Sequence, residues 1–372
     1  MPSLLYIACV NIDLNKPDGV AKKILDHFET FQKDFQVDLV TYEKNRILLK
    51  EQDNFTYLEA RKPKRFYLYQ LIYKIVKEKG YDNIYIRYPL ADPLLLFLLK
   101  KIRMINNNVK ICIEIATYPY TKSHDGDLKS YLIRKVDSLY SKKLHKFVNR
   151  IITFSKDKSI FGIPTINTIN GINFSRVKLT ESLYDYQKLD LISVSMLYVC
   201  HGYDRIIEGL RIYYSVEQKV KVYFHIVGEG PEYNRYRDLI NRYSLEKYVF
   251  LHGFLSGDNL DNLYGLSHIA VNSLAIHRIG LENESTLKAK EYAAKGLPII
   301  SSSFIDSFSS QDNFKYVFKV DGTDSPIDIY KLIIFYNNVY KQPNLHNEIR
   351  ERSSQVCDMS VALKPVSSFY NS

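Results

Sequence analysis

The sequence predicts an α/β protein built from two doubly wound, Rossmann-like domains that face each other across a cleft. Apolar stretches typical of buried strands alternate with amphipathic helical stretches through most of the chain, and this alternation predicts parallel βαβ units. A polar, turn-rich stretch at 172–188 interrupts the alternation and divides it into two series. The length of 372 residues also favours two domains over one.

The first domain is expected to span residues 1–180. It opens with the apolar strand SLLYIACV at 3–10, and a loop containing Pro17 and Gly19 leads into a helix with apolar residues at helical spacing. The elements expected next are a strand at 37–42, a helix at 66–79, a strand at 83–89, a helix at 92–103, a strand at 109–115, a basic helix at 127–147 and strands at 149–155 and 165–171.

The second domain is expected to span residues 181–345, and the last segment, 346–372, is expected to pack back on the first domain. In open α/β sheets ligands bind beyond the carboxyl ends of the strands, which places the site in the cleft. The expected elements are strands at 189–197, 221–230, 249–254, 268–274 and 297–303, with helices at 202–216, 231–243 and 285–295.

Composition excludes several classes of protein. Hydrophobic residues make up 46% and charged residues 25% of the chain, so a packed core is expected rather than disorder. The start has no basic segment with a small-residue cleavage site, and the longest apolar stretch, 94–99, is too short to span a bilayer. Because Cys9, Cys112, Cys200 and Cys357 are scattered without metal-binding spacing, we expect free thiols and a cytoplasmic protein.

The net charge of +10 belongs entirely to the first half of the chain. Residues 1–180 contain 31 Lys and Arg against 18 Asp and Glu, a net of +13, whereas the remainder has 20 against 23, a net of −3. Such asymmetry predicts that the first half meets a polyanionic surface, with nucleic acid and an anionic membrane as the two candidates.

Glu291 carries the strongest local signal for a binding site. It lies in a predicted helix that stops at Gly296, one helical turn after Lys288. A carboxylate accepts hydrogen bonds from the vicinal hydroxyls of a ribose, and Lys288 near the helix start is placed to face a phosphate. An ordinary solvated helix face with a charge pair is the alternative.

Two glycine-containing loops follow predicted strands. In IVGEGPE, Gly228 and Gly230 allow the backbone to turn sharply and to approach a ligand, although the spacing of a dinucleotide fingerprint is missing. In PDGVAKK, Gly19 lies between the first strand and the first helix. Plain strand-to-helix turns remain the alternative for both loops.

Two histidines mark further candidates. In VCHGYDRIIEGL, His201 opens a helix whose amides can bind a phosphate, with Arg205 as a counter-charge one turn later. In EIATYPYTKSHDGD, His124 is a candidate general acid or base. A capping role for His201 and solvation of Arg205 and His124 are the alternatives.

In this order and spacing, the motifs resemble those of the family 4 (group 1) glycosyltransferases with the GT-B architecture, and more narrowly the bacterial members that assemble surface polysaccharides such as capsules. The motifs are IYIRYP, EIATYPY, HGYDRIIEGL, IVGEGPE, FLHG and STLKAKEYAAKGLPII. The resemblance implies a retaining transfer from a UDP- or GDP-linked sugar to a glycan or polyprenyl-linked acceptor, without a bound metal or other cofactor. It also implies a cytoplasmic enzyme that contacts the inner face of the membrane.

The resemblance assigns roles to five of these residues. Glu291 matches the family's ribose-binding glutamate, and Lys288 matches a lysine that faces the diphosphate. Gly19 matches the first-loop glycine near the donor phosphates, and Gly228 and Gly230 match the loop near the nucleobase. Lys288 is thereby both a donor-binding and a catalytic candidate.

The sequence departs from the family pattern at two places. Asn283 occupies the position of the first glutamate of the family's pair, and Glu282 or Glu284 beside it can fill the role, with Glu284 as our catalytic candidate. Ser195 and His201 occupy donor-site positions where the family commonly has Arg and Lys. Arg205 and Lys288 are then expected to supply the positive charge.

Three other functions stay open at this point. The departures are also those expected of a catalytically degenerate partner or scaffold subunit of a glycosyltransferase complex. An epimerase can share the GT-B architecture. A nucleic-acid-binding protein would explain the charge, but the sequence lacks a recognised nucleic-acid motif, and we expect no nucleic-acid partner.

Overall fold

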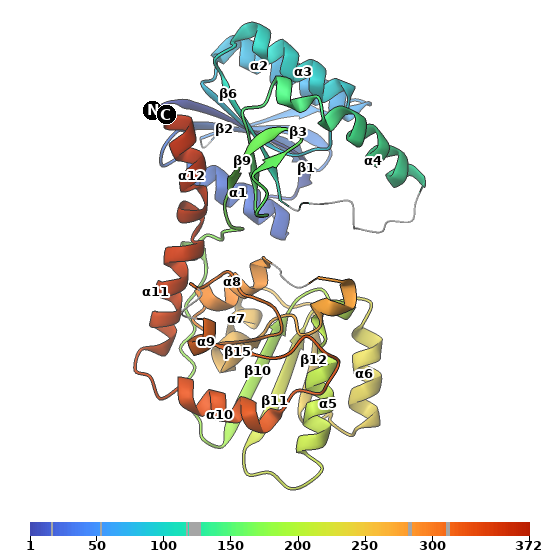
Figure 1. Cartoon of the computed structure of the whole chain (residues 1–372), viewed down its shortest axis with the longest axis vertical. Helices are drawn as coiled ribbons and strands as arrows, with labels where there is room; N and C mark the ends of the chain where they lie inside the picture. The colour runs from blue at the N-terminus through green and yellow to red at the C-terminus, as the bar shows by residue number, and fades with distance from the viewer. Residues whose placement is uncertain (16–17, 53, 117, 119–127, 282–284, 310–312) are drawn as a thin grey trace. The chain divides into compact units, whose positions relative to one another are not determined.

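Two separate units of α/β structure make up the chain in the computed structural model (Figure 1). The structure describes residues 1–15, 18–52, 54–116, 118, 128–281, 285–309 and 313–372. Unit 1 consists of Met1–Asn170 and Met359–Ser372, and unit 2 consists of Gly171–Asp358. The chain therefore passes from one unit to the other near residue 170, whereas the sequence suggested a boundary at 180, and it returns near residue 358.

Unit 1 contains a mainly parallel sheet with the strand order β4-β3-β2-β1-β5-β6-β7-β9-β8 in its described residues. The strands are β1 (Ser3–Ile12), β2 (Gln36–Glu43), β3 (Arg46–Glu51), β4 (Asn54–Glu59), β5 (Asn83–Arg87), β6 (Lys110–Ile115), β7 (Arg150–Thr153), β8 (Ser159–Ile160) and β9 (Ile163–Asn167). The helices are α1 (Gly19–Phe31), α2 (Lys64–Lys79), α3 (Pro93–Ile105), α4 (Leu128–Ser141), the short 3₁₀ helix η2 (Leu144–Lys146) and α12 (Met359–Asn371).

Helices cover both faces of this sheet. α2 and α3 contribute Leu68, Ile72 and Leu98 to the hydrophobic core on one face, and α1 and α12 contribute Phe28 and Leu363 to the core on the other. Because buried parallel strands need apolar cover on both sides, the alternation in the sequence produces this sandwich.

The helix ends follow local sequence signals. The Asp18 side chain accepts a hydrogen bond from the Ala21 N–H at the start of α1, and Asp92 caps α3 in the same way ahead of Pro93. Such caps satisfy backbone N–H groups that the first helical turn leaves unpaired. Gly80, in the left-handed conformation, ends α2.

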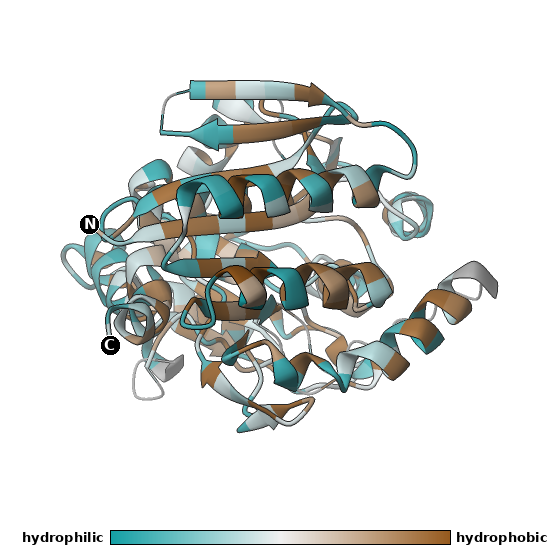
Figure 2. Cartoon of the chain, turned by 90° about the horizontal axis from the view of Figure 1, so that it is seen from above, coloured by the Kyte–Doolittle hydropathy of each residue, from teal (hydrophilic) through white to brown (hydrophobic). Residues whose placement is uncertain are grey.

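The hairpin β3–β4 was not predicted. Figure 2 shows it at the margin of the sheet, with hydrophobic and hydrophilic residues mixed along β4. Every residue of β4 is exposed, so its sequence lacks the alternation of buried and exposed positions that identifies a strand.

The C-terminal segment is divided between the units. We expected 346–372 to return to the first domain, and α12 does so, since Met359, Val366 and Tyr370 are buried in the unit 1 core. The preceding helix, α11 (Leu345–Cys357), packs against unit 2 instead.

Unit 2 contains a fully parallel sheet with the order β12-β11-β10-β13-β14-β15 in its described residues. The strands are β10 (Lys188–Val194), β11 (Lys221–Val227), β12 (Val249–Gly253), β13 (Ile269–Val271), β14 (Ile299–Ser301) and β15 (Val317–Lys319). The helices are η3 (Phe174–Arg176), η4 (Val199–His201), α5 (Asp204–Tyr213), α6 (Tyr233–Arg242), α7 (Gly257–Leu266), η5 (Ile276–Ile279), α8 (Leu287–Ala294), α9 (Asn313–Tyr316), α10 (Ile329–Val339) and α11.

This strand order creates a switch point in unit 2. The chain runs outward from β10 through β11 to β12 and then returns to the other side of β10 with β13. The connections that leave the carboxyl ends of β10 and β13 therefore diverge, and ligands of doubly wound sheets bind in the crevice that this divergence opens.

The four cysteines are free thiols, as expected; Cys112 and Cys357 are buried, and Cys9 and Cys200 are half-buried. Among the described residues, no helix is long and apolar enough to cross a bilayer.

Candidate functional site

The switch point of unit 2 brings together residues from three distant parts of the chain. Ser195 follows β10 directly, and Ser273 follows β13 after one intervening residue. Lys288, at the second position of α8, donates from its Nζ to the Ser273 Oγ at 2.9 Å. The structure thus joins Lys288 to the carboxyl end of the sheet, where the sequence predicted a donor site.

The loop after β10 holds the ring of His201 in place. The Tyr198 backbone N–H, which can only donate, lies 3.3 Å from the His201 Nδ1, and the Ser195 hydroxyl lies 3.3 Å from the same nitrogen. The Ser195 hydroxyl is also 2.9 Å from the hydroxyl of buried Tyr203. The imidazole of His201 is thereby held by hydrogen-bonding groups of the loop that follows β10.

His201 is a neutral group beside a cation. Its ring stacks on Tyr203 with 5.5 Å between the ring centroids. Burial, followed by the positive charge of Lys288, lowers the pKa of His201 to about 3. At neutral pH the site therefore combines a neutral imidazole with an ammonium group.

α8 places Glu291 one turn after Lys288. The helix begins after Thr286 and ends before Gly296, whose positive φ of 77° stops it. Glu291 is half-buried, and after burial its negative charge is the largest cause of the raised pKa of Tyr264. The charge of Glu291 thus lies close enough to a buried phenol to affect its titration.

Two contacts hold α8 against the sheet. The Tyr292 hydroxyl accepts a hydrogen bond from the Val194 N–H at 2.9 Å, at the carboxyl end of β10. The fully buried ammonium of Lys290 lies 2.9 Å from the Asp306 carboxylate and donates to the Ser285 hydroxyl at 2.7 Å. Lys290 was not among the predicted site residues, because nothing in its local sequence distinguishes it from a solvated lysine.

Gly228 and Gly230 pack against the protein itself. Their φ values are 130° and 151°, and a Cβ on Gly228 would lie 1.9 Å from the Ser195 carbonyl oxygen. The Leu197 N–H also donates to the Glu229 carbonyl at 2.8 Å. We expected these glycines to let the backbone approach a ligand, but contact with the loop after β10 already requires them.

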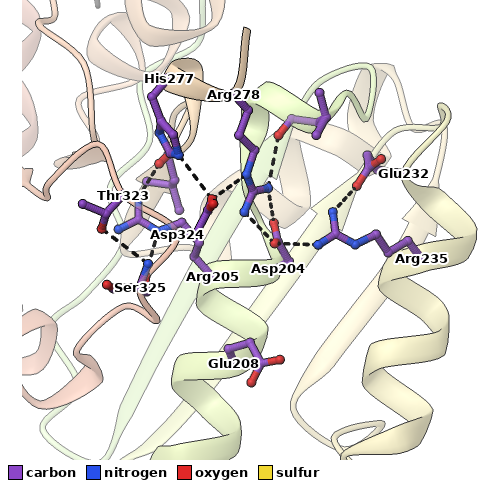
Figure 3. Close-up of polar contacts among 12 residues, drawn as sticks. Asp204, Arg205, Glu208, Glu232, Arg235, His277, Arg278, Thr323, Asp324 and Ser325 are labelled. Carbon is purple, nitrogen blue, oxygen red and sulfur yellow. Dashed lines mark hydrogen bonds and ion pairs between the residues drawn. The ribbon is translucent and has the colours of Figure 1, made fainter. Parts of the chain in front are cut away.

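Arg205, which we expected as a counter-charge for a phosphate, bonds to carbonyl groups of the protein (Figure 3). The residue is 3% exposed, and its guanidinium donates to the carbonyls of Ser325 at 2.8 Å, Asp321 at 3.0 Å and Leu274. These bonds join α5 to two loops, so the group is engaged within the protein.

A neighbouring ion-pair network was not foreseen either (Figure 3). Arg278 in η5 donates to both Asp204 carboxylate oxygens, at 2.9 and 2.8 Å, and its Nε donates to Asp324 at 2.7 Å. This bidentate pair ties the loop after β13 to the start of α5. Asp324 and Asp204 lie 46 and 74 positions from Arg278 in the chain, so no local sequence spacing reveals the network.

Gly19 and two catalytic candidates remain as predictions. Gly19 is the first residue of α1 in unit 1, and apart from its neighbours in the chain and in α1, no atom of the described residues lies within 4 Å of the position that a Cβ would take. His124 and Glu284 lie outside the described residues, as do Glu282 and Asn283.

No group of three or more His, Cys, Asp or Glu side chains that could hold a metal occurs within the described ranges.

Two Rossmann-like units, each with helices on both faces of a parallel-rich sheet, define a protein of the GT-B class. Residues 190–323, most of unit 2, match the family model described as Glycosyl transferases group 1. The match and the fold agree with the resemblance to group 1 glycosyltransferases noted from the sequence and support a glycosyltransferase enzyme. Comparison with curated protein sequences gave no match.

Solved structures of glycosyltransferases share the fold over nearly the whole chain. The Anabaena protein HepE in complex with UDP is 13% identical, with a TM-score of 0.64 and coverage of 99% of both chains. A glycosyltransferase from Rickettsia africae is 12% identical, with a TM-score of 0.63 and coverage of 100% and 98%. Sucrose-phosphate synthase from Thermosynechococcus elongatus is 13% identical, with a TM-score of 0.64 and coverage of 99% and 98%.

Proposed function

We propose that the enzyme transfers a sugar from a nucleotide-sugar donor, bound at the unit 2 switch point, to a glycan or lipid-linked acceptor. The observation that carries this proposal is the position of Lys288 at the carboxyl end of β13, where its charge lowers the pKa of His201, with Glu291 one helical turn later on α8. A carboxylate suits a ribose, whereas an ammonium and an imidazole N–H suit a diphosphate.

Lys288 and the start of α8 would stabilise the leaving diphosphate. Negative charge grows on the diphosphate as the glycosidic bond breaks, and fixed positive groups lower the energy of that transition state. Lys288 supplies a full charge, and backbone N–H groups in the first turn of α8 supply partial charges. We propose that these groups act without a metal and that configuration is retained, as the resemblance to group 1 enzymes implies.

A screen of nucleotide sugars by thermal shift tests the donor. A ligand that binds the native state raises the melting temperature by mass action, so the true donor identifies itself among UDP- and GDP-linked sugars. UDP is the first candidate because HepE was solved in complex with UDP. We expect hydrolysis of the best donor to proceed in EDTA; a strict need for a divalent cation would contradict metal independence.

A catalytically degenerate scaffold subunit is the second candidate function. Ser195 and His201 are uncharged, so Lys288 is the cation that the described part of this site contributes. This small positive charge favours the scaffold function. Calorimetric titration with UDP and GDP separates the two functions. Binding together with slow donor hydrolysis supports the enzyme, and failure to bind either nucleotide supports the scaffold.

We further propose that the acceptor belongs to surface polysaccharide synthesis and that unit 1 contacts an anionic membrane. α4 exposes Tyr131 (58%), Leu132 (53%) and Leu139 (64%), and Arg134 and Lys135 lie on the same helix. Apolar side chains among basic ones suit a membrane interface.

α4 is anchored to unit 1 despite these exposed side chains. The buried Asp137 carboxylate accepts from the Ala91 N–H at 2.6 Å and from the Tyr88 hydroxyl at 2.5 Å. Flotation with phosphatidylglycerol vesicles tests the contact: we expect binding that Leu132→Asp weakens and that pure phosphatidylcholine does not support. Equal flotation of both proteins would contradict it.

A further inference from the structure

The carboxyl ends of the unit 1 strands hold a second charged cluster, which the donor site does not use. In this sheet β2 and β5 lie on opposite sides of β1, so unit 1 also has a switch point. Arg87 is the last residue of β5, and its Cα partner on the next strand, β6, is Glu114. Both residues therefore lie at the edge of the sheet where ligands of such folds bind.

Glu114 is a fully buried carboxylate between two cations. Its Oε1 lies 3.1 Å from the Lys23 Nζ, and its Oε2 accepts from the Arg87 Nη1 at 3.3 Å. Burial alone would raise the pKa of Glu114, but the charge of Lys23, followed by His27 and Arg87, lowers it to about 2. The carboxylate is therefore ionised at any physiological pH and fixes both cations.

Lys23 is used within the protein. Besides Glu114, its ammonium contacts the Asn170 side-chain oxygen and lies 4.3 Å from the centre of the Phe154 ring. These contacts join α1 to β6 and to the last residue of the first segment of unit 1. Lys23 thus has a structural role as the partner of Glu114.

Arg87 differs from Lys23 in its geometry. A guanidinium carries five N–H donors in a planar fork, whereas Glu114 accepts one hydrogen bond and the Tyr6 hydroxyl lies against another part of the group. The Arg87 side chain also keeps 18% of its surface exposed. A braced guanidinium on a partly exposed side chain is pre-organised for bidentate binding of an oxyanion.

We propose that Arg87 binds a phosphate group of the acceptor at the switch point of unit 1. This inference rests on the proposed transferase function, and it names the chemistry of the acceptor. A diphosphate-linked lipid and a phosphorylated sugar both offer the required oxyanion. The proposal also gives the motif IYIRYP a role that its strand position alone does not explain.

The test uses the full chain and two probes, geranyl diphosphate and glucose 1-phosphate, titrated by calorimetry with and without saturating UDP. We expect at least one probe to bind while UDP occupies unit 2, and the probe that binds identifies the source of the phosphate. Arg87→Gln should weaken that binding about 10- to 100-fold. Arg87→Lys keeps the charge but loses the planar fork of donors, so its affinity for the probe should lie between those of the wild type and Arg87→Gln.

Arg61→Gln is the matched control, because Arg61 is an exposed residue of the same unit. An equal loss of probe affinity in Arg61→Gln and Arg87→Gln would mean that the probe is held by general charge attraction, and it would overturn the proposal. Failure of the wild type to bind either probe, or unchanged binding in Arg87→Gln, would also overturn it. If Arg87→Gln does not fold, affinity in Arg87→Lys equal to that of wild type contradicts the proposal.

UDP titration of the same samples keeps the two proposals distinguishable. UDP binding without phosphate-probe binding refutes only the role of Arg87. Phosphate binding that is lost in Lys288→Ala and preserved in Arg87→Gln would place the probe in unit 2, and the role of Arg87 would again be refuted.

Discussion

The substitution Gly228→Ala tests the finding that the glycine loop after β11 is required by the protein's own packing. The new Cβ would lie 1.9 Å from the Ser195 carbonyl oxygen and 2.9 Å from the Ser195 carbonyl carbon, at a φ of 130°. Both contacts are with backbone, so no side-chain rotation relieves them.

The cost follows from two effects. An L-residue in a sparsely populated backbone region costs about 1–3 kcal/mol, and displacing a packed backbone adds about 1–3 kcal/mol. We therefore expect unit 2 to lose about 2–6 kcal/mol of stability. For a unit of this size, each kcal/mol lowers the melting temperature by about 2–4 °C, so the expected decrease is about 4–24 °C.

Gly265→Ala is the control in the same unit. Gly265 lies in α7, and nothing lies within 4 Å of its Cβ position. Alanine in an exposed helix is favoured by about 1 kcal/mol over glycine, so this variant should melt at the same temperature as the wild type or slightly higher. Differential scanning calorimetry of both variants checks the comparison; an unchanged melting temperature for Gly228→Ala would refute the packing argument.

Three further predictions concern the supports of the donor site. Arg205→Met should lower the melting temperature while leaving the UDP dissociation constant of the folded protein unchanged, because its guanidinium bonds only to carbonyls among the described residues; weaker UDP binding by calorimetry would restore Arg205 to the donor site. Lys290→Ala should cost about 2–4 kcal/mol in a urea unfolding experiment, since it leaves Asp306 without its buried partner; a loss below about 0.5 kcal/mol would contradict this. His201 has a folded-state pKa of about 3, below the value near 6.5 of an unfolded histidine, so the unfolded state binds the proton more readily and stability falls as the pH drops from 6.5 towards 3. His201→Gln should lose less stability than the wild type over that window in thermal melts, and identical pH profiles would count against a buried neutral imidazole.

The fold was predictable because its signals are local. Each signal lies within a window of a few residues. Examples are the apolar runs of the strands, the helix caps at Asp18 and Asp92, and the helix stop at Gly296. The turn spacing of Lys288 and Glu291 follows from the 3.6-residue period in the same way. The exposed strand β4 has no buried face, so no pattern marked it.

The roles of several site residues depended on partners far along the chain. Arg205 bonds to a carbonyl 120 positions away, and the Lys290 ammonium bonds to Asp306. Gly228 is required by its packing against Ser195, 33 positions earlier. Each motif therefore indicated where a loop lies, whereas tertiary packing decided what its side chains contact.

The assignment of the donor site depends most directly on the carboxylate of Glu291 as a ligand of the donor nucleotide. Calorimetric titration of UDP into the wild type, Glu291→Gln and the exposed control Glu351→Gln measures this contact. Hydrogen bonds to a charged group contribute about 1.5–3 kcal/mol, so we expect the dissociation constant to rise about 10- to 100-fold in Glu291→Gln and to stay unchanged in Glu351→Gln. Wild-type affinity for UDP in Glu291→Gln would contradict the assignment of the donor site.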